Sequence, residues 1–147
     1  MADDEQFEEL LTAMRAAAAS LRDGGVAFAL AGGLAVYARG GPPTEHDVDF
    51  LIREDECERA AELLTDAGFR VERPPEGWLL KAFDEREAMI DLIFRPNNKP
   101  EVVSRMLEKA DVLEVYAITI PVMRVTDVLA TKLLTLKEHE VDYESVL

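Results

Sequence analysis

Cysteine and histidine are scarce in this sequence. Its 147 residues include one cysteine, Cys57, and two histidines. One cysteine cannot form an internal disulfide, and no cysteine and histidine residues have the spacing of a zinc site. A domain of this length can bury roughly 68–70% of its unfolded surface, so it can form a hydrophobic core without a disulfide or a structural zinc ion. We interpret Cys57 as a small core or boundary residue rather than a nucleophile, because no partner base is evident.

Basic residues are also few. There are 16 Lys and Arg residues against 30 Asp and Glu, which gives a net charge of −14. A field of this sign repels a polyanion, so extended nucleic acid is a disfavoured partner. A nucleotide whose phosphates are neutralised by Mg²⁺ is still compatible with the charge, because the metal inverts the local electrostatics. A basic protein partner and a cationic small molecule fit it as well.

Long apolar runs, internal repeats, low-complexity tracts and interdomain linkers are absent from the sequence. No apolar run approaches the ~20 residues of a membrane span, and the first residues are acidic where an export or transit segment would be basic. We therefore expect a cytoplasmic protein without a membrane segment. At about 150 residues per domain, residues 1–147 are most simply one domain.

Hydrophobic periodicity, glycines and prolines divide the chain into helices and strands. Period-3.6 patterns predict helices over residues 7–21, 34–39, 54–67, 101–109 and 126–138. Short apolar or alternating runs predict strands over residues 26–31, 47–52, 69–71, 78–83, 88–94 and 112–120. Short loops favour antiparallel neighbours among the later strands. This order predicts a mixed sheet in an α/β or α+β domain.

Two aspartates alternate at the start of the strand over 47–52. Asp47 and Asp49 share one face, about 6.6 Å apart along the strand, and carboxylates so placed can hold two Mg²⁺ ions about 3.5–4 Å apart for phosphoryl or nucleotidyl transfer. Asp91 is the natural third carboxylate, because it interrupts an apolar run where a lone charge is costly. The alternatives are a solvated strand end for Asp47 and Asp49 and an exposed position for Asp91.

Gly32 and Gly33 lie between a predicted strand and a predicted helix. At such a turn, backbone N–H groups can approach a phosphate, and the helix N-terminus adds partial positive charge. A tight turn with no ligand is the better explanation of the pair when it is taken without Asp47 and Asp49.

Together these segments resemble the minimal nucleotidyltransferases of the polymerase-beta-like superfamily, which includes antibiotic nucleotidyltransferases and AbiEii-type toxins. The resemblance is carried by Gly32-Gly33-Leu34-Ala35, Thr44-Glu45-His46-Asp47-Val48-Asp49-Phe50-Leu51, Ile90-Asp91-Leu92-Ile93 and Val125-Thr126-Asp127-Val128-Leu129-Ala130-Thr131-Lys132-Leu133-Leu134. It implies the nucleotidyltransferase fold, an α+β arrangement in which helices flank a mixed twisted sheet.

The resemblance also implies roles for individual residues. The metal ligands would be Asp47, Asp49 and Asp91, with Asp91 helping to deprotonate the acceptor hydroxyl. Two Mg²⁺ ions are expected, with Mn²⁺ as an alternative. The nucleotide phosphates would be bound by Gly32, Gly33, Thr44 and Lys132. Without the resemblance, Lys132 is equally well explained as a side chain that packs on the apolar stripe of its helix and extends its ammonium to water.

Three features of the sequence depart from this pattern or add to it. Relatives often carry an arginine where Pro42 stands, which leaves Arg39 or no residue for that part of the phosphate grip. His46 is a candidate outer hydrogen-bond partner of the metal site, although a solvated loop histidine explains it better. Trp78 and Phe83 are candidates for an acceptor platform, although we favour core positions for both.

The sequence therefore predicts a Mg²⁺-dependent enzyme that moves a nucleoside monophosphate from an NTP to a hydroxyl acceptor. The acceptor is a small molecule, a protein or RNA, and the charge favours the first two. A role in a toxin–antitoxin or resistance system, with a cognate protein partner, is the expected setting. The alternative is an inactive nucleotide-binding or protein-interaction module on the same fold.

Overall fold

A computed structural model of the chain describes residues 2–42, 47–95 and 100–130. The helices are α1 (Ala2–Asp23), α2 (Gly32–Ala38), the 3₁₀ turn η1 (Glu54–Glu56), α3 (Cys57–Asp66) and α4 (Pro100–Lys109). The strands are β1 (Phe28–Ala31), β2 (Val48–Ile52), β3 (Arg70–Glu72), β4 (Leu79–Phe83), β5 (Met89–Ile93), β6 (Asp111–Val115) and β7 (Ile118–Val122). Residues 125–130 are also helical.

The strands form one mixed sheet in the order β3-β4-β5-β2-β1-β7-β6. The β3–β4 and β4–β5 pairs are antiparallel, as the short loops predict, and β2 pairs in parallel with β5. β1 lies antiparallel to β2 and parallel to β7. This confirms the predicted α+β class with a mixed sheet, and it places β5, β2 and β1 at the centre.

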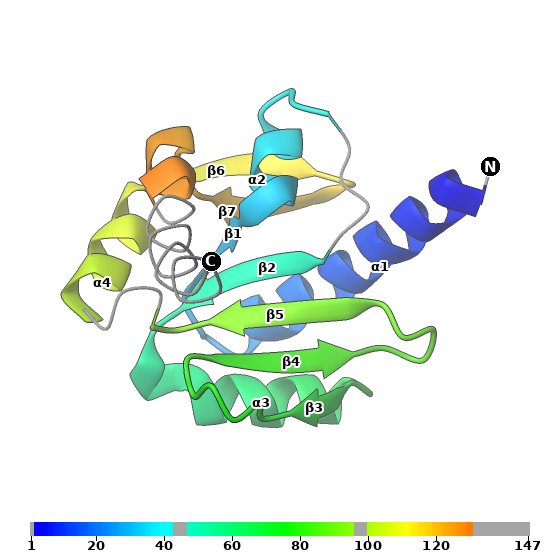
Figure 1. The fold of residues 1–147 in the computed structure, drawn as a ribbon, viewed down its shortest axis with the longest axis horizontal. Coiled ribbons are helices and arrows are strands. Elements are labelled where there is room, and N and C mark those ends of the chain that lie inside the picture. Colours follow the sequence, from blue (N-terminus) through cyan, green and yellow to red (C-terminus); the bar gives the residue numbers. More distant parts are fainter. Residues whose placement is uncertain (1, 43–46, 96–99, 131–147) are drawn as a thin grey trace, which may run out of the picture.

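Helices cover both faces of this sheet (Figure 1). α1 and α3 contact each other and pack on the β2, β3, β4 and β5 part of the sheet, whereas α2 lies on the opposite face against β1 and β2. The packing follows from the apolar stripe of α1, where Met14, Ala17 and Leu21 are fully buried. Every residue of β1 is buried, as expected for a central strand with both faces covered.

The segment over 112–120 differs from the prediction of one strand. It forms the antiparallel hairpin β6–β7, and β7 runs through Pro121, which pairs in register with Val112. The turn is made by Tyr116 and Ala117, which adopt positive φ angles of 50° and 63°. Asparagine and glycine usually mark such turns, so the sequence carries no signal for this one.

The last predicted helix is only partly within the described chain. Residues 125–130 are helical as expected, and the rest of the predicted range over 126–138 lies outside the described residues. Among the residues that are described, no helix has both the length and the apolar character needed to cross a bilayer.

Candidate functional site

The three central strands bring Gly32, Asp49 and Asp91 side by side. Ala31, the last residue of β1, pairs with Asp49 of β2, and Asp49 pairs with Asp91 of β5. Neighbouring strands lie about 4.8 Å apart, so the two carboxylates project from adjacent positions of the sheet. Asp47 precedes β2 by one residue and is half-buried. The chain therefore gathers in space three residues that are far apart in its sequence.

Gly32 lies directly against the carboxylate of Asp49. Its φ of +60° is a left-handed conformation, and a Cβ added there would collide with the carboxylate of Asp49. Glycine is therefore required here both by the backbone angle and by the neighbouring side chain. The following helix α2 has no acidic residue in its first turn, and its N-cap residue Ala31 offers no side-chain hydrogen bond to the first N–H groups of the helix.

Asp91 is buried, with 8% of its surface exposed, and its charge has a partner. The Lys81 Nζ donates to its Oδ1 at 2.9 Å, and the two residues face each other across β4 and β5. Lys81 Nζ also lies 3.5 Å from Met89 Sδ. Sequence reasoning missed Lys81. The available signal was that Lys81 interrupts the apolar run from Trp78 to Phe83 in the way that Asp91 interrupts its own strand.

The side chains of Asp47, Asp49 and Asp91 have the chemistry that a divalent cation requires. Carboxylate oxygens are the donors that Mg²⁺ prefers, and the absence of a side chain at Gly32 lets the Asp49 carboxylate lie against the turn. Within residues 2–42, 47–95 and 100–130, however, no three aspartate, glutamate, histidine or cysteine side chains converge as a metal site. The carboxylate of Asp91 is held by Lys81 instead, so its role as third metal ligand stays a prediction.

Arg39 is engaged elsewhere and does not serve the glycine turn. Its Nε donates to the Met123 carbonyl at 3.0 Å, and its Nη2 donates to the Val122 carbonyl at 3.1 Å and to Asp111 Oδ2 at 3.0 Å. These contacts tie the end of α2 to β6 and β7. Relatives often carry an arginine at the position of Pro42, and either Arg39 or no residue could take its part. Because Arg39 is bound to β6 and to the end of β7, the structure favours the second alternative.

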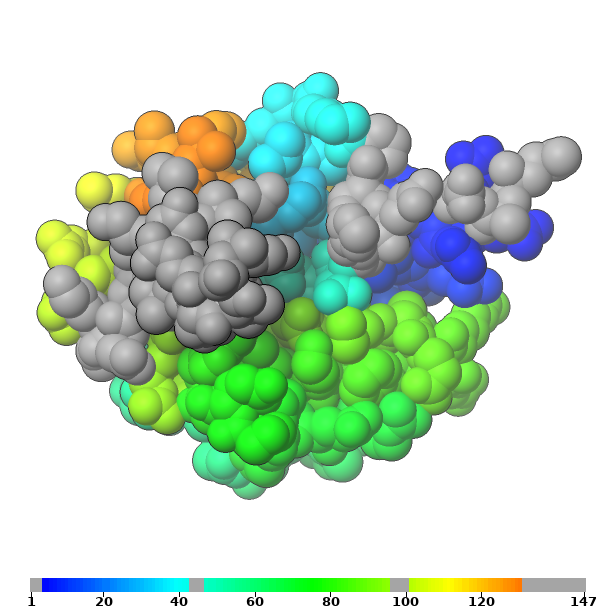
Figure 2. Space-filling model, viewed as in Figure 1, coloured from blue at the N-terminus to red at the C-terminus, as the bar shows by residue number. Residues whose placement is uncertain are grey.

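A cavity of about 780 Å³ opens beside Asp91. Trp78 lines it and is 38% exposed, so the prediction of a core position for Trp78 is wrong. Phe83 is half-buried on β4, where the Arg70 guanidinium lies 4.6 Å from the centre of its ring. Figure 2 shows the segment from β3 to β5, in green, on the open surface of this face.

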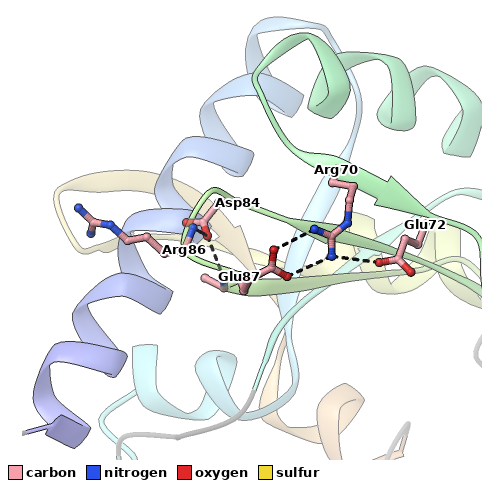
Figure 3. Close-up of polar contacts among 6 residues, drawn as sticks. Arg70, Glu72, Asp84, Arg86 and Glu87 are labelled. Atoms are coloured by element: carbon pink, nitrogen blue, oxygen red, sulfur yellow. Dashed lines mark hydrogen bonds and ion pairs between the residues drawn. The ribbon is translucent and has the colours of Figure 1, made fainter.

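Ion pairs fix the outer strand next to this cavity. Arg70 donates to both carboxylate oxygens of Glu87, at 2.8 Å and 3.0 Å, and to Glu72 at 3.3 Å (Figure 3). The hydrogen bonds from Arg70 hold the pKa of Glu87 below its ordinary value, and those carboxylates raise the pKa of Arg70. Asp84 closes the β4–β5 turn by accepting from the backbone N–H groups of Arg86 and Ala88, both at 2.9 Å.

Of the remaining residues singled out in the sequence, the structure describes only Cys57. Cys57 packs against the core as predicted, and burial, followed by the nearby Glu58, raises the pKa of its thiol. A raised pKa keeps the sulfur protonated and unreactive. Thr44, His46 and Lys132 lie outside the described residues.

Compared by sequence, the chain matches no protein-family model and no curated protein. Solved structures do resemble it. A Thermotoga maritima protein provisionally named a nucleotidyltransferase has a TM-score of 0.71 at 15% identity, over 95% of this chain and 93% of that one. The lincosamide adenylyltransferase LnuA, bound to lincomycin, has a TM-score of 0.55 at 17% identity, over 75% and 77%. A nucleotidyltransferase-like antigen of Paracoccidioides brasiliensis has a TM-score of 0.55 at 17% identity, over 90% and 66%. These likenesses concern the architecture, and this chain has the nucleotidyltransferase fold.

Proposed function

We propose that the protein is a nucleotidyltransferase that moves a nucleoside monophosphate from an NTP to a hydroxyl acceptor. The observation that carries the proposal is the register of the central strands, which sets Gly32 of the turn, Asp49 and Asp91 next to one another on this fold. A turn that admits a phosphate beside paired carboxylates is the minimum that this reaction needs.

The reaction assigns a task to each part of the site. The acceptor oxygen bonds to the α-phosphorus, the bond from that phosphorus to the bridging oxygen breaks, and pyrophosphate leaves with the electron pair. Gly32 and Gly33 bind the triphosphate through backbone N–H groups, and Asp91 takes the proton of the acceptor hydroxyl. Lys81 fixes the Asp91 carboxylate by its 2.9 Å contact.

Mg²⁺, with Mn²⁺ as an alternative, is the cofactor that we propose for Asp47 and Asp49. When bound, it neutralises charge on the phosphate oxygens. The name of LnuA, a lincosamide adenylyltransferase, supports a small-molecule acceptor, and the net charge of −14 permits a cationic one. A protein hydroxyl on a cognate partner, within a toxin–antitoxin or resistance system, is the other acceptor that we retain.

The proposal is tested by Asp49→Asn, measured as transfer of label from each of the four α-³²P NTPs to acceptors in a host lysate. We expect transfer to fall at least 100-fold, because the carboxylate beside Gly32 loses its charge. Asp66→Asn is the matched control, since Asp66 is an exposed residue at the end of α3. Equal transfer by Asp49→Asn and Asp66→Asn would refute the assignment.

A nucleotide-binding module without turnover is the second candidate. It is favoured by the hydrogen bond from Arg39 to Val122 of β7, which engages that arginine, and by the ion pair between Asp91 and Lys81, which already neutralises the Asp91 carboxylate. Calorimetry with Mg²⁺ and each NTP, followed by an assay for pyrophosphate, separates the two functions. Tight nucleotide binding without pyrophosphate release, in the presence of the lysate, would support the module.

A further inference from the structure

The cavity beside Asp91 lies on the side of the carboxylates that faces away from the glycine turn. Along the sheet order β4-β5-β2-β1, Lys81 stands on β4, Asp91 on β5 and Asp49 on β2, and Gly32 follows β1. A triphosphate bound at Gly32 therefore leaves the β4 side of Asp91 open. The cavity walls are formed by Glu72, Arg73, Pro74, Pro75, Glu76, Trp78, Leu79, Lys81 and Asp91.

Hydrogen bonds to the end of β5 hold the outer wall in place. Arg95 Nη2 donates to the Gly77 carbonyl at 2.7 Å, and the backbone N–H groups of Phe94 and Arg95 donate to the Trp78 carbonyl at 3.1 Å and 3.4 Å. Arg95 Nε is 3.2 Å from Glu54 Oε1, which anchors the guanidinium in turn. The loop that carries Glu76 and Trp78 is therefore organised before any ligand binds. At about 780 Å³, the cavity has the size of a small-molecule site.

The charges along the wall leave one carboxylate in excess. Lys81 is paired with Asp91 at 2.9 Å. Arg73 is paired with Glu58 at 2.7 Å, which lies outside the cavity. Glu72 is paired with Arg70 at 3.3 Å, also outside it. Glu76 is exposed, and within the described chain it has no hydrogen-bond or ion-pair partner. An incoming cation would therefore find its counter-charge at Glu76.

Trp78 supplies the second feature that suits a cation. It is a large aromatic side chain, 38% exposed, and it lines the same wall two residues after Glu76. The face of an indole ring attracts an ammonium group more strongly than any other side-chain ring does. Pro74, Pro75 and Leu79 add apolar surface around it. The cavity thus combines a carboxylate, an aromatic face and apolar contact.

We propose that this cavity is the acceptor site and that it takes a hydroxylated organic cation. The ammonium group binds at Glu76 and Trp78, and a hydroxyl reaches the side of the cavity that Asp91 lines. The assignment of an acceptor rests on the proposed function, whereas the binding of the cation does not. RNA and large proteins are disfavoured by the size of the cavity and by its charge.

Trp78 is the only tryptophan of the chain, so its fluorescence reports directly on the cavity. The probe is benzyl(2-hydroxyethyl)dimethylammonium, and its control is 3,3-dimethyl-4-phenylbutan-1-ol, in which carbon replaces the quaternary nitrogen. Both have one hydroxyl and nearly the same shape, and the charge of the probe is independent of pH. We expect the cation to shift the Trp78 emission to shorter wavelength and to bind about tenfold more tightly than the neutral isostere.

Glu76→Gln should weaken binding of the cation about threefold to fivefold and leave the isostere unaffected. Glu114→Gln removes the same charge from β6, at the opposite edge of the sheet, and should change neither. Equal affinities for the two probes, equal effects of the two substitutions, or no response of Trp78 would each overturn the proposal. So would displacement of the cation by Mg·ATP, because the cavity would then hold the nucleotide base.

These measurements need no turnover, which separates the two ideas. Binding of the cation by a protein that transfers no nucleotide would refute the proposed function and leave the cation site standing. If the protein transfers nucleotide but its Trp78 emission does not respond to the cation, the cation site is refuted and the proposed function stands. If both stand, wild-type protein with Mg·NTP should add one nucleoside monophosphate to the probe hydroxyl, visible as a mass shift that Asp49→Asn abolishes.

Discussion

Gly32 couples the backbone turn to the carboxylate of Asp49, and its substitution should affect both. Gly32→Ala places a methyl group against Asp49 and forces alanine to a φ of +60°. We expect a loss of about 2–3 kcal/mol in the free energy of unfolding, because the left-handed angle costs about 1–2 kcal/mol and the displaced carboxylate adds to it. Urea denaturation measures this loss. Affinity for Mg·NTP should fall at least tenfold by calorimetry.

Gly25→Ala is the matched control for this substitution. Gly25 has a similar φ of +78°, but no atom lies within 4 Å of an added Cβ. Only the backbone term remains, so we expect a loss of about 1 kcal/mol and unchanged affinity for Mg·NTP. If the two variants lost the same stability and had the same affinity for Mg·NTP, the contact between Gly32 and Asp49 would contribute to neither property.

The sequence alone singles out the candidate residues of the site, but it does not tell which of them lie next to one another. Asp49 and Asp91 stand out in the sequence because each alternates with apolar residues of a buried strand. Their adjacency depends on the parallel register of β2 and β5, which no local pattern encodes. The pairing of Asp91 with Lys81 was missed for the same reason, since it needs the antiparallel register of β4 and β5.

The edge strand β3 is held by the Arg70–Glu87 pair, and the pKa of Glu87 reports on it. Arg70 lowers this pKa in the folded protein, so the pair stabilises the fold fully above the unfolded-state pKa of about 4.3. That stabilisation is lost as the pH falls through the lower folded-state pKa. Arg70→Met should return the Glu87 pKa to its ordinary value, as measured by carbon NMR of the side-chain carboxyl group.

Arg86→Met is the control for the Glu87 titration. Arg86 lies one residue from Glu87, but its guanidinium points away from that carboxylate (Figure 3). We therefore expect the Glu87 pKa of Arg86→Met to stay below its ordinary value, as in the wild type. A Glu87 pKa that moved equally in both variants would show that net charge, rather than the hydrogen bonds from Arg70, sets it.

At the scale of elements, periodicity and turn residues predicted most of the fold. The helix α1 and the strands β1 to β5 were found because apolar spacing and flanking glycines or charged turns mark them. The hairpin β6–β7 was missed because Tyr116 and Ala117 form its turn without glycine, asparagine or proline. The sheet order was beyond local patterns, because β5 is inserted between β4 and β2 by long-range pairing.

The whole molecule carries a net charge of −14, and this excess should make its stability depend on salt. Repulsion among like charges opposes the compact state, and it is screened as the Debye length falls from about 30 Å at 0.01 M salt to about 8 Å at 0.15 M. We expect NaCl to raise the Tm at pH 7, by roughly 2–5 °C for each kcal/mol of relieved repulsion. Calorimetric scans from 0.01 to 0.5 M NaCl measure the shift.

The same scans at pH 4.5 provide the control, because the sequence pI is about 4.5 and the net charge there is near zero. The repulsion is then absent, so the rise in Tm with NaCl should disappear even if the Tm itself is lower. Salt also screens attractive pairs such as Arg39–Asp111, whose atoms are 3.0 Å apart. A Tm that fell with NaCl at pH 7 would mean that these attractions outweigh the repulsion. Most of the surface carboxylates would then be paired with basic side chains. The electrostatic attraction between the protein and a cationic acceptor would accordingly be weak.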